Sequence, residues 1–428
     1  MRRRFAWLPL MACLWCAQDA TAASQHYFYP FVNPYEATVL ELPSAFEVKF
    51  PATVPTTELT LKVFPKREIP EVFWYENGLV CSLVYQDHKA PLIFVIAGTG
   101  SRYNSPLMVK LQKVLYQAGF HVISFSSPTH MDFVVNASAG LPGDSLDDAQ
   151  DLYRVMELAY EKVRTKIDVS SFALTGYSLG GFNAAFISKL DDEKKRFNFS
   201  RVLLINPPVD VYVSASILDQ MLVDNIPGGM DKFDPWLRTI LEKLLSVTGA
   251  LGLTELTGDY LYAAYKRLRP SEETLAALIG LVFRLSAANM MFTADVMNGG
   301  GYIVPRHARL TNSTSLTRFA EVSFRTGLVD YFNEYFLPYR QQREPGLTRQ
   351  ALLDRLSLRS IEPYLKGADK IGLIHNEDDI TLAPGEIDYL EGIFGARARV
   401  FPTGGHLGNL FHPDVVRAML DFLTAKGK

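Results

Sequence analysis

The feature that most constrains the fold of this chain is a regular alternation of short apolar runs with amphipathic helical patterns, which begins at Pro91. The expected elements follow in the order strand 92–96, helix 105–118, strand 121–125, helix 147–163, strand 172–175, helix 179–190 and strand 202–205. Strands that alternate with helices predict a mostly parallel sheet with helices on both faces.

The alternation stops at residue 207 and resumes near residue 366. The segment 207–365 carries long helical patterns and few strand signals, whereas 366–428 again alternates strand and helix. The expected elements of this last part are strand 371–375, helix 384–394, strand 399–401 and helix 413–425. Because neither half of the sheet would bury its face alone, we expect one α/β core, 91–206 and 366–428, with 207–365 inserted as a helical cap.

The segment 24–90 precedes this core and is expected to be β-rich. Residues 46–50 and 59–63 alternate between apolar and polar side chains, and proline and Asn-Gly signals separate the runs.

The first 22 residues have the composition of a signal peptide. Three arginines at positions 2–4 precede a short apolar stretch, and Ala20-Thr21-Ala22 is the small-x-small pattern of a cleavage site. We therefore expect export to the periplasm or the medium after cleavage near Ala22. A poorly matched lipoprotein box that ends at Cys13 is the alternative. The formal charge of −3 provides no basic face for nucleic acid.

One internal stretch, 275–291, is apolar enough to suggest a membrane span. Arg284 lies near its middle, where a charge would cost several kcal/mol in lipid. We expect this stretch to be a helix of the cap, so that the mature chain has no transmembrane span.

The strongest motif is Gly176-Tyr177-Ser178-Leu179-Gly180-Gly181, which lies between an expected strand and an expected helix. This is the setting of a nucleophile elbow, a sharp turn that raises a serine hydroxyl above the edge of the sheet. Glycines at 176 and 180 remove the Cβ atoms that would collide with neighbouring elements in such a turn. Without that setting, the string would be a glycine-rich turn with a capping serine.

With this motif in its setting, the core resembles the α/β-hydrolase superfamily. The resemblance implies a triad in the chain order nucleophile, acid, histidine. Ser178 would be the nucleophile, and His406, which follows the last strand between glycines, would be the general base. His412 also lies in this region, but it precedes a proline at an expected helix start.

The acid is expected from the segment His375-Asn376-Glu377-Asp378-Asp379, which resembles the family's H-G-x-x-D segment. Counting from that pattern selects Asp379. A shift by one residue would select Asp378, and Asp210, after the preceding strand, is the site that some family members use.

The resemblance also implies an oxyanion hole made by two backbone N–H groups. Leu179, the residue after the nucleophile, would supply one of them. Thr99 would supply the other, because Ala97-Gly98-Thr99-Gly100 resembles the family's H-G-x-G segment, with alanine in place of the histidine.

The expected reaction is hydrolysis of carboxylic esters, lipids among them, through an acyl-enzyme. The sequence suggests no metal or organic cofactor, and it does not indicate an oligomeric state. A peptidase or amidase with the same triad is one alternative, and a non-catalytic binding protein on a hydrolase scaffold is the other.

Overall fold

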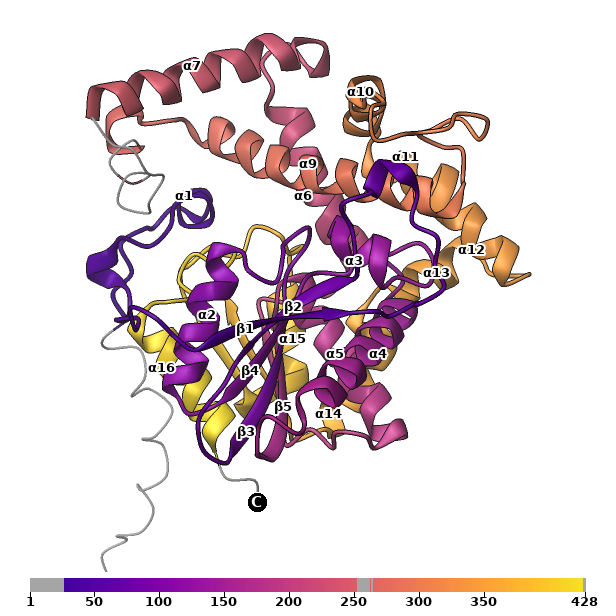
Figure 1. Cartoon of the computed structure of the whole chain (residues 1–428). Coiled ribbons are helices and arrows are strands. Elements are labelled where there is room, and N and C mark those ends of the chain that lie inside the picture. Colours follow the sequence, from indigo (N-terminus) through magenta and orange to yellow (C-terminus); the bar gives the residue numbers. More distant parts are fainter. Residues whose placement is uncertain (1–26, 252–261, 263–264, 426–428) are drawn as a thin grey trace, which may run out of the picture.

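A computed structural model describes residues 27–251, 262 and 265–425 of the 428-residue chain. The expected signal peptide, with its cleavage site and Cys13, lies outside the described residues. Figure 1 shows a central sheet between layers of helices, with a group of further helices stacked above one end of the sheet.

The sheet has eight strands in the order β1-β2-β4-β3-β5-β6-β7-β8. Their bounds are β1 Thr56–Leu61, β2 Leu79–Val84, β3 Ala90–Ile96, β4 His121–Phe125, β5 Val169–Tyr177, β6 Arg201–Ile205, β7 Ile371–Asn376 and β8 Ala398–Phe401. Strand β2 pairs antiparallel with β1 and with β4, whereas all pairs from β4 to β8 are parallel. The expected mostly parallel α/β sheet is therefore confirmed.

Helices cover both faces of this sheet, as the alternation in sequence predicts. α2 (Pro106–Gln117) and α16 (Pro413–Thr424) pack on one face, and α4 (Ser145–Val163), α5 (Leu179–Lys194) and α15 (Glu386–Phe394) pack on the other. Neighbouring residues of a strand point to opposite faces. On β3, Ile93 therefore joins the core on the α2 side, and Phe94 joins the core on the α5 side.

The N-terminal segment contains less strand than its sequence pattern predicts. Residues 46–50 form no strand, because Ser44–Phe46 is a single 3₁₀ turn and the following chain is irregular. Prolines at 43 and 51 flank this run and cannot donate to a ladder of backbone hydrogen bonds. Residues 27–42, which we call the N-terminal arm, contain the short helix α1 (Pro34–Val39) and no strand.

The chain between β6 and β7 forms a helical cap, and its described residues contain no named strand. Its helices are α6 Val211–Asn225, α7 Phe233–Leu251, α9 Glu272–Asn298, α10 Thr317–Arg325, α11 Leu328–Tyr331, α12 Leu337–Arg343, α13 Arg349–Arg355 and α14 Glu362–Gly367. A further short helix, α3 (Met131–Asn136), follows β4 and contacts α9.

α9 contains the apolar stretch with Arg284 at its middle. By length and composition α9 could cross a membrane, but 56% of its most apolar stretch is buried inside the protein. Arg284 is buried and forms an ion pair with Asp219 of α6. It also donates to the carbonyl of Phe324 at 3.0 Å. The charge in this stretch therefore has its partners inside the cap.

This ion pair yields a stability prediction. Because Asp219→Ala leaves the buried Arg284 guanidinium without its carboxylate, we expect the free energy of unfolding to fall by about 3–5 kcal/mol. Urea unfolding followed by circular dichroism measures the change. Asp224→Ala on the exposed side of the same helix is the control, with an expected loss below about 0.5 kcal/mol. Equal losses in the two variants would contradict a buried pair.

Candidate active site

A sharp turn joins β5 to α5 and carries Ser178. The serine has φ 53° and ψ −127°, a backbone conformation that residues with a side chain rarely adopt. Its N–H donates to the carbonyl of Ile205 at 2.8 Å, and its carbonyl accepts from Phe182 at 3.1 Å. The strained backbone conformation of Ser178 is thus stabilised by hydrogen bonds to β6 and to the first turn of α5.

Two glycines make this turn sterically possible. A Cβ atom at Gly176 would lie 2.3 Å from the carbonyl oxygen of Gly180. A Cβ atom at Gly180 would lie 2.2 Å from the carbonyl oxygen of Ile96 on β3. Because both contacts are with backbone atoms that cannot rotate away, these positions require glycine.

Ser178, His406 and Asp379 form a continuous chain of hydrogen-bonding distances. The Nε2 atom of His406 lies 2.9 Å from Oγ of Ser178. Its Nδ1 atom lies 2.9 Å from Oδ2 and 3.1 Å from Oδ1 of Asp379. The structure thus brings together the three side chains singled out in the sequence, which lie up to 228 residues apart.

Asp379 lies in a buried and polar environment. Its Oδ1 accepts from the backbone and the hydroxyl of Thr381 at 3.0 and 2.7 Å, and its Oδ2 accepts from Asn206 at 2.9 Å. Burial alone would raise the pKa of Asp379. The nearby His406, His375 and Asn206 outweigh burial and lower this pKa below its ordinary value. The carboxylate is therefore held in its charged form beside the imidazole.

The candidate oxyanion donors lie on two sides of Ser178. Leu179 begins α5, and the first N–H groups of a helix have no partner within the helix. Thr99 belongs to the loop after β3, in which a Cβ atom at Gly98 would lie 3.1 Å from the Cβ of Ser178. This loop therefore runs directly beside the serine, and Thr99 and Leu179 line the same pocket.

These observations decide the fold. A mostly parallel sheet carries a serine on a strained turn between a strand and a helix, and the serine, the acid and the histidine follow in this order along the chain. The chain has the α/β-hydrolase fold.

No protein-family model matches the chain, and no curated protein matches its sequence. Solved structures with a similar fold include an esterase of Pyrococcus furiosus (10% identity, TM-score 0.41, 91% of this chain and 98% of that chain). Brefeldin A esterase, a bacterial homologue of human hormone-sensitive lipase, is another (14% identity, TM-score 0.42, 91% of this chain and 79% of that chain). A carboxyl esterase of Bacillus coagulans is a third (13% identity, TM-score 0.42, 87% of this chain and 98% of that chain). The α/β-hydrolase fold itself follows from the strand order and from the turn at Ser178.

The two alternative acids have other contacts in this structure. Asp378 accepts the backbone N–H groups of Gly404 and Gly405 at 3.1 and 2.8 Å, so it fixes the loop before His406. Asp210 caps the N-terminus of α6, where it accepts from Val213 at 2.9 Å.

His412 and the remaining side chains near the triad also have defined places. His412 is the N-cap of α16, which agrees with its expected boundary position. Sequence reasoning missed Thr381 and Asn206, both of which donate to Asp379. Asn206 has φ 44° directly after β6, and an Asn-Pro pair at a strand end is the only local signal for such a turn. The described residues contain no group of three or more side chains that could hold a metal ion.

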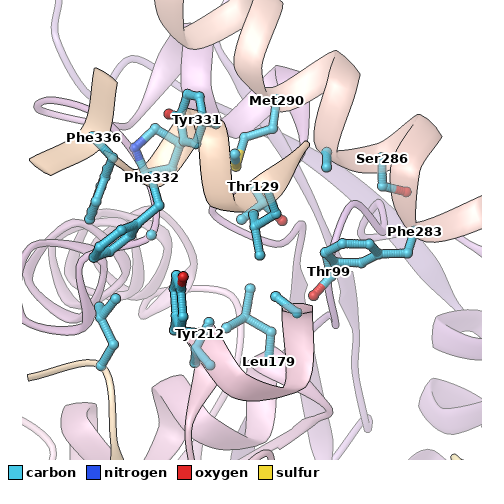
Figure 2. Close-up of a pocket in the computed structure, with 17 residues that line it drawn as sticks. Thr99, Thr129, Leu179, Tyr212, Phe283, Ser286, Met290, Tyr331, Phe332 and Phe336 are labelled. Carbon is cyan, nitrogen blue, oxygen red and sulfur yellow. The ribbon is translucent and has the colours of Figure 1, made fainter. Parts of the chain in front are cut away.

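A pocket adjoins the turn at Ser178 and is roofed by the cap (Figure 2). Leu179 and Thr99 lie on its core side, and Met290 and Phe283 of α9 face them. The described residues that line it are Thr99, Thr129, Pro142, Gly143, Leu179, Val211, Tyr212, Ala215, Phe283, Ser286, Ala287, Met290, Leu328, Tyr331, Phe332, Phe336 and Leu356. No charged side chain is among these described residues. The pocket thus offers a mostly apolar surface beside the turn that carries Ser178.

Proposed function

We propose that this chain is a serine hydrolase that cleaves carboxylic esters with an apolar acyl group. The observation that carries the proposal is the hydrogen-bonded chain Ser178–His406–Asp379, in which Nε2 of the imidazole lies 2.9 Å from the serine hydroxyl. A nucleophile, a base within hydrogen-bonding reach and a third group that orients the base are the parts that acyl transfer requires.

The proposed reaction begins when Oγ of Ser178 attacks the ester carbonyl carbon and Nε2 of His406 takes the hydroxyl proton. The carbonyl oxygen becomes an oxyanion, which the N–H groups of Leu179 and Thr99 stabilise. The C–O bond to the alcohol then breaks, and His406 returns the proton to the leaving alkoxide. Water repeats the sequence on the acyl-enzyme, which releases the carboxylic acid and restores the serine hydroxyl.

Asp379 has an electrostatic and orienting role in this reaction. Its carboxylate faces Nδ1 of His406, so it selects the tautomer in which Nε2 can accept the serine proton. The lowered pKa keeps the carboxylate negative, and this charge stabilises the imidazolium that forms during the attack.

The acyl side of the substrate is proposed to occupy the pocket under the cap. Support comes from the described residues of its lining, whose polar side-chain groups are the hydroxyls of tyrosine, threonine and serine. An uncharged aliphatic chain gains from leaving water in such a pocket, whereas a charged group would lose its hydration without a partner.

A variant of the pocket tests this choice of substrate. Ala215 of α6 lines the pocket, and a phenylalanine there would fill part of it. For Ala215→Phe we expect kcat/KM for a p-nitrophenyl octanoate to fall at least about tenfold relative to the acetate. A panel of p-nitrophenyl esters from two to twelve carbons measures the effect, and Ala215→Ser serves as the size control. An equal loss on both esters would count against acyl binding in this pocket.

Export is part of the proposal. The basic, apolar and small-residue pattern of residues 1–22 supports cleavage near Ala22 and release into the periplasm or the medium. Amino-terminal sequencing of the protein recovered from its native host tests this, and an intact Met1 would contradict it.

A further inference from the structure

The N-terminal arm contacts the loop that carries His406. The backbone N–H of His406 donates to the hydroxyl oxygen of Thr38 at 2.9 Å. Thr38 belongs to α1, and its own hydroxyl proton is donated to the carbonyl of Pro34 at 2.7 Å. The bond to Pro34 orients the hydroxyl so that its oxygen can accept the N–H of His406.

Further contacts join the arm to the histidine loop, residues 402–412. The hydroxyl of Tyr27 donates to the carbonyl of Thr403 at 2.6 Å. A Cβ atom at Gly408 would lie 1.9 Å from the carbonyl oxygen of Ala37, so α1 and the loop are in direct backbone contact. The arm therefore meets the loop both before and after His406.

The histidine loop depends on such contacts because it is not part of a helix or a strand. Gly405 and Leu407, which flank His406, have φ angles of 53° and 69°. A leucine with positive φ is strained, and a strained residue persists only where its surroundings hold it. The position of the imidazole therefore depends on the partners of its own backbone.

The arm also contacts the cap. Asn33 donates to Glu272 at the start of α9 at 2.8 Å, and the hydroxyl of Tyr265 donates to Glu36. Figure 1 shows α1 between α9 and the yellow C-terminal part of the chain. One short segment thus touches both the loop of the base and the roof of the pocket.

We propose that the N-terminal arm positions the general base, with Thr38 as its positioning residue. The inference rests on the proposed hydrolase function of Ser178 and His406. Thr38 touches no reacting atom and acts by fixing the backbone of His406, so that Nε2 remains in line with the serine hydroxyl. Its loss should slow the chemical step and leave substrate binding in the pocket largely unchanged.

The test compares three variants in the full chain. Thr38→Val keeps the shape of the side chain but removes the acceptor, and Thr38→Ser keeps the hydroxyl. Thr424→Val is the matched control, because Thr424 makes the same bond to the carbonyl four residues earlier, at 2.7 Å, near the end of α16. Kinetics on p-nitrophenyl butyrate are normalised to the fraction of sites labelled by a fluorophosphonate, and hydrogen–deuterium exchange is followed in peptides of 402–412.

For Thr38→Val we expect kcat to fall about tenfold or more and KM to change less than about twofold, since small displacements of a catalytic group are costly. Exchange in 402–412 should rise. Thr38→Ser should restore both, and Thr424→Val should resemble the wild type. The inference is overturned if Thr38→Val keeps the wild-type kcat and exchange, or if Thr38→Ser loses as much activity as Thr38→Val.

The failure of the proposed function gives a different result. In that case the wild type neither turns over the ester nor takes the label at Ser178. The exchange comparison still decides whether Thr38 holds the loop, because it needs no activity: unchanged exchange in Thr38→Val overturns the inference, and raised exchange that Thr38→Ser reverses supports it.

Discussion

Ser178→Ala is expected to lower kcat for a p-nitrophenyl ester by about 10⁴-fold or more, because no acyl-enzyme can form without the hydroxyl. Steady-state and stopped-flow assays of the purified variant measure the loss, and the burst of p-nitrophenol should disappear. Residual turnover above the uncatalysed rate would come from the pocket and the oxyanion donors alone.

Ser188→Ala on the same helix is the control for this prediction. Ser188 is buried, and its hydroxyl is bonded to that of Tyr364 at 2.8 Å, so the variant tests the loss of a serine from α5 outside the turn. We expect its kcat to stay within about threefold of the wild type, because the removed bond is worth only about 1 kcal/mol of stability. If Ser178→Ala turned over the ester at the wild-type rate, Ser178 would not be the nucleophile.

The second large effect is expected for Asp379→Asn, for which kcat should fall by about 10³–10⁴-fold. An amide can donate to Nδ1 of His406 and thereby favour the tautomer whose Nε2 carries a proton and cannot accept one from Ser178. Because the pKa of Asp379 is lowered, wild-type activity should show no loss from protonation of this carboxyl above about pH 4. Initial rates from pH 4 to 9 test both statements.

Asp210→Asn discriminates between the acids that the sequence left open. Asp210 caps α6 and accepts from Val213, a bond that the oxygen of asparagine can also accept. Its kcat should therefore stay within about threefold of the wild type, since asparagine and aspartate are similar caps. If kcat fell more in Asp210→Asn than in Asp379→Asn, the acid of the triad would be Asp210, which follows β6, and not Asp379.

The core of this fold could be predicted because its signals are local. The apolar run 92–96 is too short for a helix and lies between turn residues, so it predicts a strand. The structure contains this strand as β3, Ala90–Ile96, which starts two residues earlier than predicted. Residues 172–175 lie inside β5, and the glycines around Ser178 mark the turn that follows it. Strand, turn and helix are each encoded within a few residues, and this is why the fold and the serine's surroundings followed from the sequence.

Other features depend on contacts that are distant in the sequence. Thr38 and His406 are 368 residues apart, and no local pattern relates them. Asn206 could be placed at a strand end but not beside Asp379, because that distance depends on how β6 and β7 pair. Residues 46–50 have a strand pattern but belong to none of the named strands. Their contacts are instead with the loop before α16, where the N–H of Val48 donates to the carbonyl of Phe411 at 3.0 Å and the ring of Phe50 packs edge-on against that of Phe411.

The most direct test of the proposed hydrolase is covalent labelling of the folded protein with a fluorophosphonate, followed by peptide mass spectrometry. The imidazole of His406 should activate one serine, so the probe should modify Ser178 stoichiometrically and labelling should be lost in His406→Ala. A protein that hydrolyses the ester while Ser178 stays unmodified, or one that carries the label on another serine, would contradict the mechanism.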